Sequence, residues 1–148
     1  MKQYLFALLG TFVLFSCSKN NDGGSSTPTK GQLLTLANWT IESAAFRLGT
    51  TDYPLPITSC LSDNIFTFRS DNTGTMNEGT DICSGSQQST NFTWSFANNE
   101  TAMNISGVSI AGVSGQFKLV ELSTTRLSLG RDTTISSVNG TFIVNFKH

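Results

Sequence analysis

Hydrophobic and polar residues alternate along most of the chain after residue 38. In the clearest segment, Phe92, Trp94 and Phe96 alternate with Thr93 and Ser95. Such alternation places every second side chain on one face of a β-strand, as in a sheet with one buried face. Similar segments follow at short intervals, and none of the segments between them is long enough for a crossover helix. The pattern therefore predicts an all-β domain of about eight antiparallel strands, arranged as a barrel or a sandwich.

Short turns join the predicted strands, and one short helix precedes them. The segment 30–38 has its hydrophobic residues at a spacing that fits one or two helical turns. Residues 71–74, 98–99 and 139–140 have the composition of tight turns, and Gly74 is expected to take a positive φ angle. These turns set the limits of the strands on either side.

The first sixteen residues have the pattern of an export signal. Lys2 supplies a positive charge, the run from Tyr4 to Phe15 is almost wholly apolar, and the small residue Ser16 follows it. The apolar run is shorter than the about 20 residues that a membrane-spanning helix needs. We therefore predict a signal peptide at residues 1–16.

The end of this signal, Leu14-Phe15-Ser16-Cys17, resembles the lipobox of bacterial lipoproteins. The resemblance implies that the thiol of Cys17 carries a diacylglycerol and that Cys17 becomes the first residue of the mature chain, which ties the protein to a membrane. A non-acidic residue after the cysteine, here Ser18, implies the outer membrane. Residues 17–29 contain no large hydrophobic side chain and are predicted to be a flexible tether.

Once Cys17 is assigned to lipid, two cysteines are left. In an exported protein, Cys60 and Cys83 are expected to form a disulfide bond. Two free, buried thiols are the alternative.

One block of the chain resembles the lipocalin-like lipoproteins of bacteria. The residues that carry this resemblance are Trp39, the segment 60–68, the turn 71–74 and Cys83. The resemblance implies an up-and-down barrel formed by residues 30–148, closed around a core or a ligand pocket. It also implies an arginine over Trp39, and either Arg126 or Arg131 can supply it.

The aromatic residues of the predicted strands admit two interpretations. They either line a pocket for an apolar ligand or fill a solid core, because an eight-stranded barrel is just wide enough for side chains to fill it. If a ligand binds, the site is expected at one open mouth, with Tyr53 of a predicted loop at its rim. The candidate residues are Trp39, Phe66, Phe68, Phe92, Trp94, Phe96, Phe117 and Phe142.

The composition argues against catalysis, metal binding and nucleic-acid binding. The only histidine is the last residue, His148, which is expected to fray, so a histidine base or metal ligand is missing. Glu78 and Asp81 are interpreted as exposed loop acids. The formal net charge is −1 and no basic stripe is present. We expect no enzyme activity, no cofactor and no nucleic-acid partner.

Two functions fit these observations. The first is a lipid-anchored, lipocalin-like protein of the cell envelope that binds a small apolar or amphipathic molecule. The second is a lipoprotein with a solid core whose surface loops dock an envelope protein or a glycan.

Overall fold

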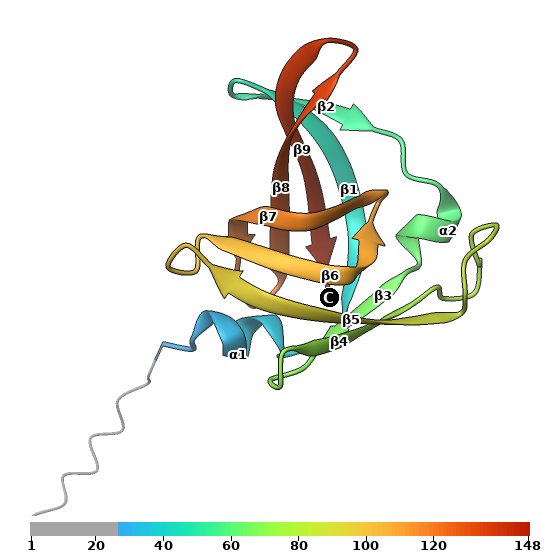
Figure 1. Ribbon diagram of the computed structural model, residues 1–148, viewed down its shortest axis with the longest axis vertical. Helices are drawn as coiled ribbons and strands as arrows, with labels where there is room; N and C mark the ends of the chain where they lie inside the picture. Colours follow the sequence, from blue (N-terminus) through green and yellow to red (C-terminus); the bar gives the residue numbers. More distant parts are fainter. Residues whose placement is uncertain (1–26) are drawn as a thin grey trace, which may run out of the picture.

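Nine antiparallel strands and two short helices are formed by residues 27–148, which are the residues that the computed structural model describes (Figure 1). The elements are α1 (Lys30–Leu34), β1 (Trp39–Leu48), β2 (Thr51–Leu55), α2 (Ser59–Ser62), β3 (Ile65–Phe68), β4 (Thr73–Asn77), β5 (Ser89–Ala97), β6 (Ala102–Ile110), β7 (Val113–Leu122), β8 (Arg126–Ile135) and β9 (Val138–Lys147). The predicted signal peptide, Cys17 and most of the predicted tether lie outside the described residues.

Eight of the strands close into a barrel. The strands from β3 to β9 pair with their neighbours in sequence order, and β1 completes the circle by pairing with both β3 and β9. Every one of these pairings is antiparallel. The prediction of an all-β, antiparallel, up-and-down barrel with a short N-terminal helix is therefore confirmed.

Helix α1 closes one end of the barrel. Its N-terminus is held by a capping box, in which Thr29 and Gln32 each bond to the backbone of the other. Leu34 and Trp39 are completely buried, and the indole Nε1 of Trp39 donates a hydrogen bond of 2.9 Å to the Leu34 carbonyl. Lys30 ties the helix to the turn between β5 and β6, since its ammonium donates to the Glu100 carbonyl. This end is called the α1 end below.

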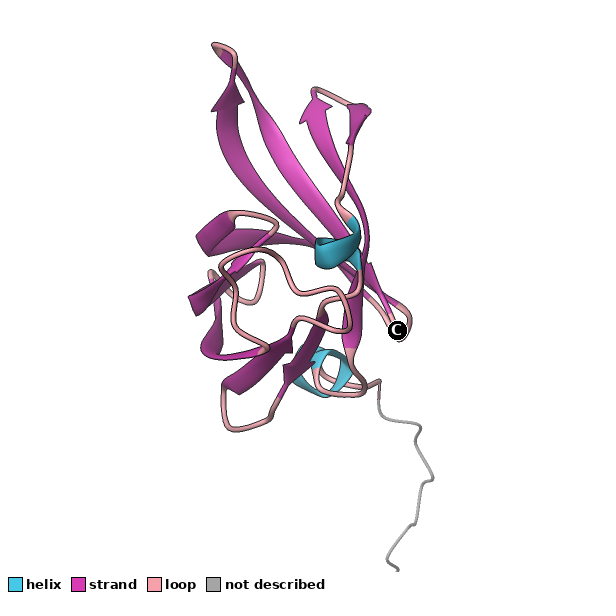
Figure 2. Ribbon diagram, turned by 90° about the vertical axis from the view of Figure 1, so that its right-hand side faces the viewer, coloured by secondary structure: helices cyan, strands magenta, loops and turns pink. Residues whose placement is uncertain are grey.

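At the opposite end, two hairpins extend beyond the barrel (Figures 1 and 2). One is β1–β2 and the other is β8–β9, and the two are joined because β1 pairs with β9 as far as Arg47 and Thr141. The tip of the second hairpin is formed by Ser136 and Ser137, both at positive φ. The predicted turn at 139–140 is therefore wrong, and these residues lie within β9. We call the four paired strands at this end the extension.

Residues 51–55 form strand β2, so the prediction of a loop around Tyr53 is wrong. These residues pair with β1 from Ala44↔Leu55 to Leu48↔Thr51. Among the described strands β2 pairs only with β1, so its outer edge is open. Proline lacks the N–H that an inner strand needs, but an edge strand tolerates it, which explains Pro54 in this strand.

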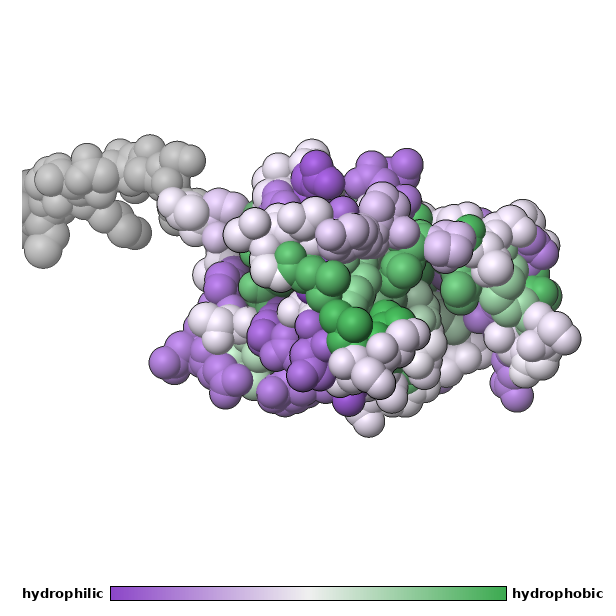
Figure 3. All heavy atoms as spheres, turned by 90° about the horizontal axis from the view of Figure 1, so that it is seen from above, coloured by the Kyte–Doolittle hydropathy of each residue, from purple (hydrophilic) through white to green (hydrophobic). Residues whose placement is uncertain are grey.

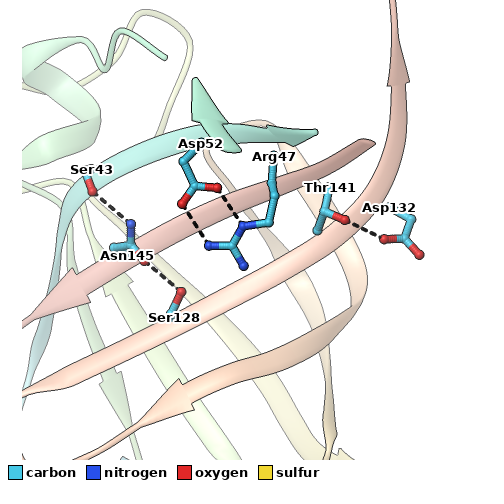
Figure 4. A network of polar contacts seen from close by, with 7 residues as sticks. All are labelled: Ser43, Arg47, Asp52, Ser128, Asp132, Thr141 and Asn145. Atoms are coloured by element: carbon cyan, nitrogen blue, oxygen red, sulfur yellow. Dashed lines mark hydrogen bonds and ion pairs between the residues drawn. The ribbon is translucent and has the colours of Figure 1, made fainter. Parts of the chain in front are cut away.

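The extension has one polar face. Arg47 and Asp52 form a double hydrogen bond across β1 and β2, with N–O distances of 2.6 and 2.8 Å. The Arg47 guanidinium lowers the pKa of Asp52 through this contact. On the same sheet, Thr141 donates to Asp132, and Asn145 links Ser43 to Ser128 (Figure 4). The alternation of side chains leaves the opposite face to residues such as Phe46 and Phe142.

Gly74 has a different role from the one predicted. Its φ angle is not positive, and Asn72 takes the left-handed conformation in this turn with φ of 66°. Gly74 lies opposite Phe92 in the β4–β5 ladder, and a Cβ atom on Gly74 would lie 2.2 Å from the Phe92 ring. The glycine therefore makes room for a core aromatic ring to lie across the backbone of β4.

The substitution Gly74→Ala tests this packing. The new methyl group overlaps the Phe92 ring, so the ring has to leave its position in the core. We expect the free energy of unfolding in urea to fall by about 1–3 kcal/mol. As a control, Gly31→Ala in α1 meets nothing closer than 3.9 Å and should not destabilise the fold. Equal stabilities of the two variants would refute the role assigned to Gly74.

Candidate functional site

The aromatic candidates lie inside the barrel. All except Phe96 are buried, Phe96 is partly buried, and all belong to one hydrophobic cluster. Their rings contact one another edge to face, for example Phe68 with Trp94 at 6.0 Å between centroids and Trp94 with Phe96 at 5.4 Å. Their arrangement is that of a packed interior, which leaves the ends of the barrel as places for a ligand site.

At the α1 end, the residue over Trp39 is a histidine and not an arginine. The ring of His148 lies 3.9 Å from the Trp39 ring, and its Nδ1 is 3.0 Å from the Asn38 carbonyl oxygen. Arg126 instead lies 3.5 Å from Glu42, and the Arg131 guanidinium lies near Gly115. The expectations of a covering arginine and of a frayed His148 are both wrong.

The opposite end is partly closed by α2 and by residues 78–88, which join β4 to β5 and are called the 78–88 loop. The predicted disulfide between Cys60 of α2 and Cys83 of this loop is present. Beside it, the hydroxyl of Ser59 donates to Asp81. At its base, the Glu78 N–H donates to the Gln88 carbonyl at 3.0 Å, which brings the two ends of the loop together. The loop is thus fixed to α2 by one covalent bond and by side-chain contacts.

Asp63, directly after α2, holds the same loop. Its Oδ2 accepts the backbone N–H groups of Asp81 and Thr80 at 2.9 and 2.8 Å. The hydrogen bond from Asp81 is the main cause that lowers the pKa of Asp63, and those from Thr80 add to it. Gly79, at positive φ, packs directly against Asp63. Only the carboxylate form accepts these bonds. They therefore stabilise the loop fully at pH values above the usual pKa of an aspartate, and this stabilisation is lost as the pH falls through the lowered pKa of Asp63.

A cavity of about 280 Å³ lies beneath the 78–88 loop at this end of the barrel. Leu61, Met76 and Val108 give it apolar walls, and Asn64 and Glu78 contribute polar groups. Its lining comes from α2 and Asn64 after it, β4, the 78–88 loop, the start of β5, the end of β6 and the turn that follows, so the loop and the barrel end together define its shape. We call it the end cavity.

The interpretation of Glu78 as an exposed loop acid is wrong, because only 2% of the residue is accessible to solvent. Its Oε2 accepts the backbone N–H of Cys83 at 3.1 Å. The sequence contains a signal for this position. Gly74, Met76 and Glu78 are spaced by two, so the alternation that directs Met76 inward continues to Glu78. Asn64 is equally buried and was not singled out from the sequence.

Several hydrophobic residues outside the end cavity pack against the core. Leu55, Ile57 and Val113 are partly buried against it. Tyr53, expected at the rim of a mouth, lies on β2 opposite Phe46 and is about half exposed. Seen from the side of the extension, hydrophobic residues gather near the centre of the molecule, and many hydrophilic residues lie toward its edges (Figure 3).

The described residues hold neither a metal-binding cluster nor a membrane-spanning helix. Between residues 27 and 148, no group of three or more His, Cys, Asp or Glu side chains is placed to hold a metal ion. Within the same range, no helix has the length and hydrophobicity needed to cross a membrane.

An eight-stranded antiparallel barrel in up-and-down order, with a helix across one end and a cavity at the other, belongs to the lipocalin-like class of barrels. Comparison with known protein families matches residues 35–129 to the lipocalin-like domain. The chain belongs to that family. No curated protein matches the chain.

Proposed function

We propose that this protein is a lipid-anchored, lipocalin-like barrel that binds a small amphipathic molecule in the end cavity. The observation that carries this proposal is the mixed lining of the cavity. Apolar walls from Leu61, Met76 and Val108 face two buried polar side chains, Asn64 and Glu78. Binding pockets combine apolar walls with a few placed polar groups in this way. The volume of about 280 Å³ suits a molecule with a short apolar chain and one polar group.

Extraction of the purified protein tests this function. Treatment with organic solvent, followed by mass spectrometry, should release one small molecule per protein chain. The matched control is a variant with a filled cavity, Val108→Trp, whose indole occupies the space of the ligand. An intact protein that releases no more small molecule than this variant would contradict the proposal.

The anchor is the second part of the proposal, and it rests on the lipobox-like sequence that ends at Cys17. Two acyl chains give stable membrane attachment where a single chain gives only marginal attachment. The variant Cys17→Ala cannot receive the diacylglycerol, so we expect it to leave the membrane fraction. Cys17→Ala that still fractionates with membranes, to the same extent as the unchanged chain, would refute the anchor. Fractionation on a density gradient then separates inner from outer membrane.

The alternative function is to bind an envelope protein or a glycan through surface loops, and the extension favours this alternative. Tyr53, Ile135 and Val138 are large hydrophobic residues that stay exposed on its two hairpins. Exposed hydrophobic groups at a protruding tip are typical of contact surfaces. This alternative gains support if the extraction experiment releases no ligand.

A further inference from the structure

The end cavity contains a buried amide oxygen without a partner. Asn64 is 98% buried, yet its Oδ1 accepts no hydrogen bond within the described residues. Its Nδ2 lies 3.8 Å from the sulfur of Met76, a weak acceptor. This contact favours the amide orientation in which Nδ2 faces the sulfur, since the amide oxygen would gain nothing from facing it. A buried acceptor left without a donor is costly, which points to a donor that comes from outside the chain.

The Glu78 carboxyl group is the second acceptor that lines the cavity. One of its oxygens accepts the Cys83 N–H. None of the ion pairs formed among residues 27–148 includes Glu78, although the residue is 98% buried. Burial of a carboxylate is costly unless a cation pairs with it. Asn64 and Glu78 thus present two hydrogen-bond acceptors, one of them acidic, to one cavity.

We propose that the end cavity binds the primary ammonium group of a small amphipathic amine. The ammonium group carries three donors and one positive charge, so it can serve both the Asn64 oxygen and the Glu78 carboxylate. The apolar walls then receive the alkyl or aryl part of the same molecule. This inference rests on the proposed function and names the class of ligand.

A metal ion fits the site less well than an ammonium group. Glu78 is the only acidic side chain that lines the cavity, and no metal-binding cluster exists among the described residues. Calcium prefers six to eight oxygen ligands, several of them carboxylates. The sulfur of Met76 and the aliphatic walls instead suit the carbon chain of an organic cation.

Three probes of one chain length test the proposal. Hexylamine, hexanol and hexanoate are titrated into the full chain with its disulfide intact, and binding is measured by calorimetry. We expect hexylamine to bind about tenfold more tightly than hexanol, because of its charge-assisted hydrogen bonds, and hexanoate to bind most weakly. Equal affinities for the three probes would overturn the amine proposal and leave ligand binding intact. If none of the three binds, the proposed function itself fails.

Variants assign the selectivity to its residues. Glu78→Gln keeps the shape of the side chain and removes its charge, so it should lose about tenfold in hexylamine affinity and keep its affinity for hexanol. Glu121→Gln removes an exposed carboxylate from β7 and should bind all three probes as the unchanged chain does. If Glu78→Gln fails to fold, Asn64→Leu tests the site instead, because it removes the other acceptor and should also lower the affinity for hexylamine. Hexylamine selectivity that survives in a folded Glu78→Gln or Asn64→Leu would refute the site.

Discussion

Replacing Trp39 by alanine should lower the free energy of unfolding by about 3–5 kcal/mol, the usual loss for a large aromatic side chain in a core. Trp39 is completely buried, donates to the Leu34 carbonyl and lies under the His148 ring. The substitution therefore removes core volume, leaves a carbonyl in α1 without its donor and uncovers the C-terminus. Urea unfolding followed by circular dichroism measures the loss.

The control for this substitution lies three residues earlier. Leu36→Ala also removes a large hydrophobic side chain, but Leu36 is 62% exposed, so its stability should change by less than about 0.5 kcal/mol. A loss of less than about 1 kcal/mol for Trp39→Ala would contradict the packing described for the α1 end.

Removal of the disulfide should have the second largest effect. The bond joins residues 23 positions apart and restricts the unfolded chain, so the double variant Cys60→Ser with Cys83→Ser should lose about 3 kcal/mol of stability. The bond also fixes the 78–88 loop to α2 over the end cavity. Amide hydrogen exchange in this loop should therefore rise more than exchange in α1.

A reducing agent provides the control for the double variant. Dithiothreitol should lower the midpoint of urea unfolding of the unchanged chain to about that of the double variant. It should leave the double variant itself unaffected. A chain whose stability is the same with and without the disulfide would show that the α2 contacts of Asp63 and Ser59 hold the loop alone.

Alternation along the chain was enough to predict the antiparallel strands, and the resemblance to lipocalin-like lipoproteins implied that they form a barrel and not a sandwich. Phe92, Trp94 and Phe96 have one spacing because a strand has one side-chain period, and this period does not depend on the rest of the fold. The disulfide could also be predicted, because the export signal and the count of cysteines leave a single pair. The strands depend on local sequence, and the disulfide depends on the oxidising compartment that the export signal implies.

The errors concern features that distant parts of the chain decide. Residues 51–55 form a strand because the end of β1 offers a free edge, which the proline of the segment does not reveal. His148 is ordered because Trp39, more than a hundred positions away, provides a ring to stack on. Gly74 matters for the Phe92 ring on the next strand and not for its own φ angle.

The candidate site also combines features that local sequence decides with features that distant parts of the chain decide. The spacing of two residues between Met76 and Glu78, which directs both side chains inward, was visible in the sequence. A carboxyl group near a polar loop, however, is more often exposed than buried. Its burial results from the 78–88 loop, which the disulfide and Asp63 bring over the barrel end. The missing partner of Asn64 can be recognised only when all of its neighbours are known.

A nuclear magnetic resonance titration of the ¹⁵N-labelled chain with hexylamine tests the central claim, that a ligand binds beneath the 78–88 loop. We predict that the amide signals of Asn64, Met76, Glu78 and Val108 shift in a saturable manner, because these residues line the end cavity. Signals at the α1 end, such as those of Leu34 and Trp39, should stay in place. Saturable shifts confined to the α1 end, or no saturable shifts at all, would contradict the account.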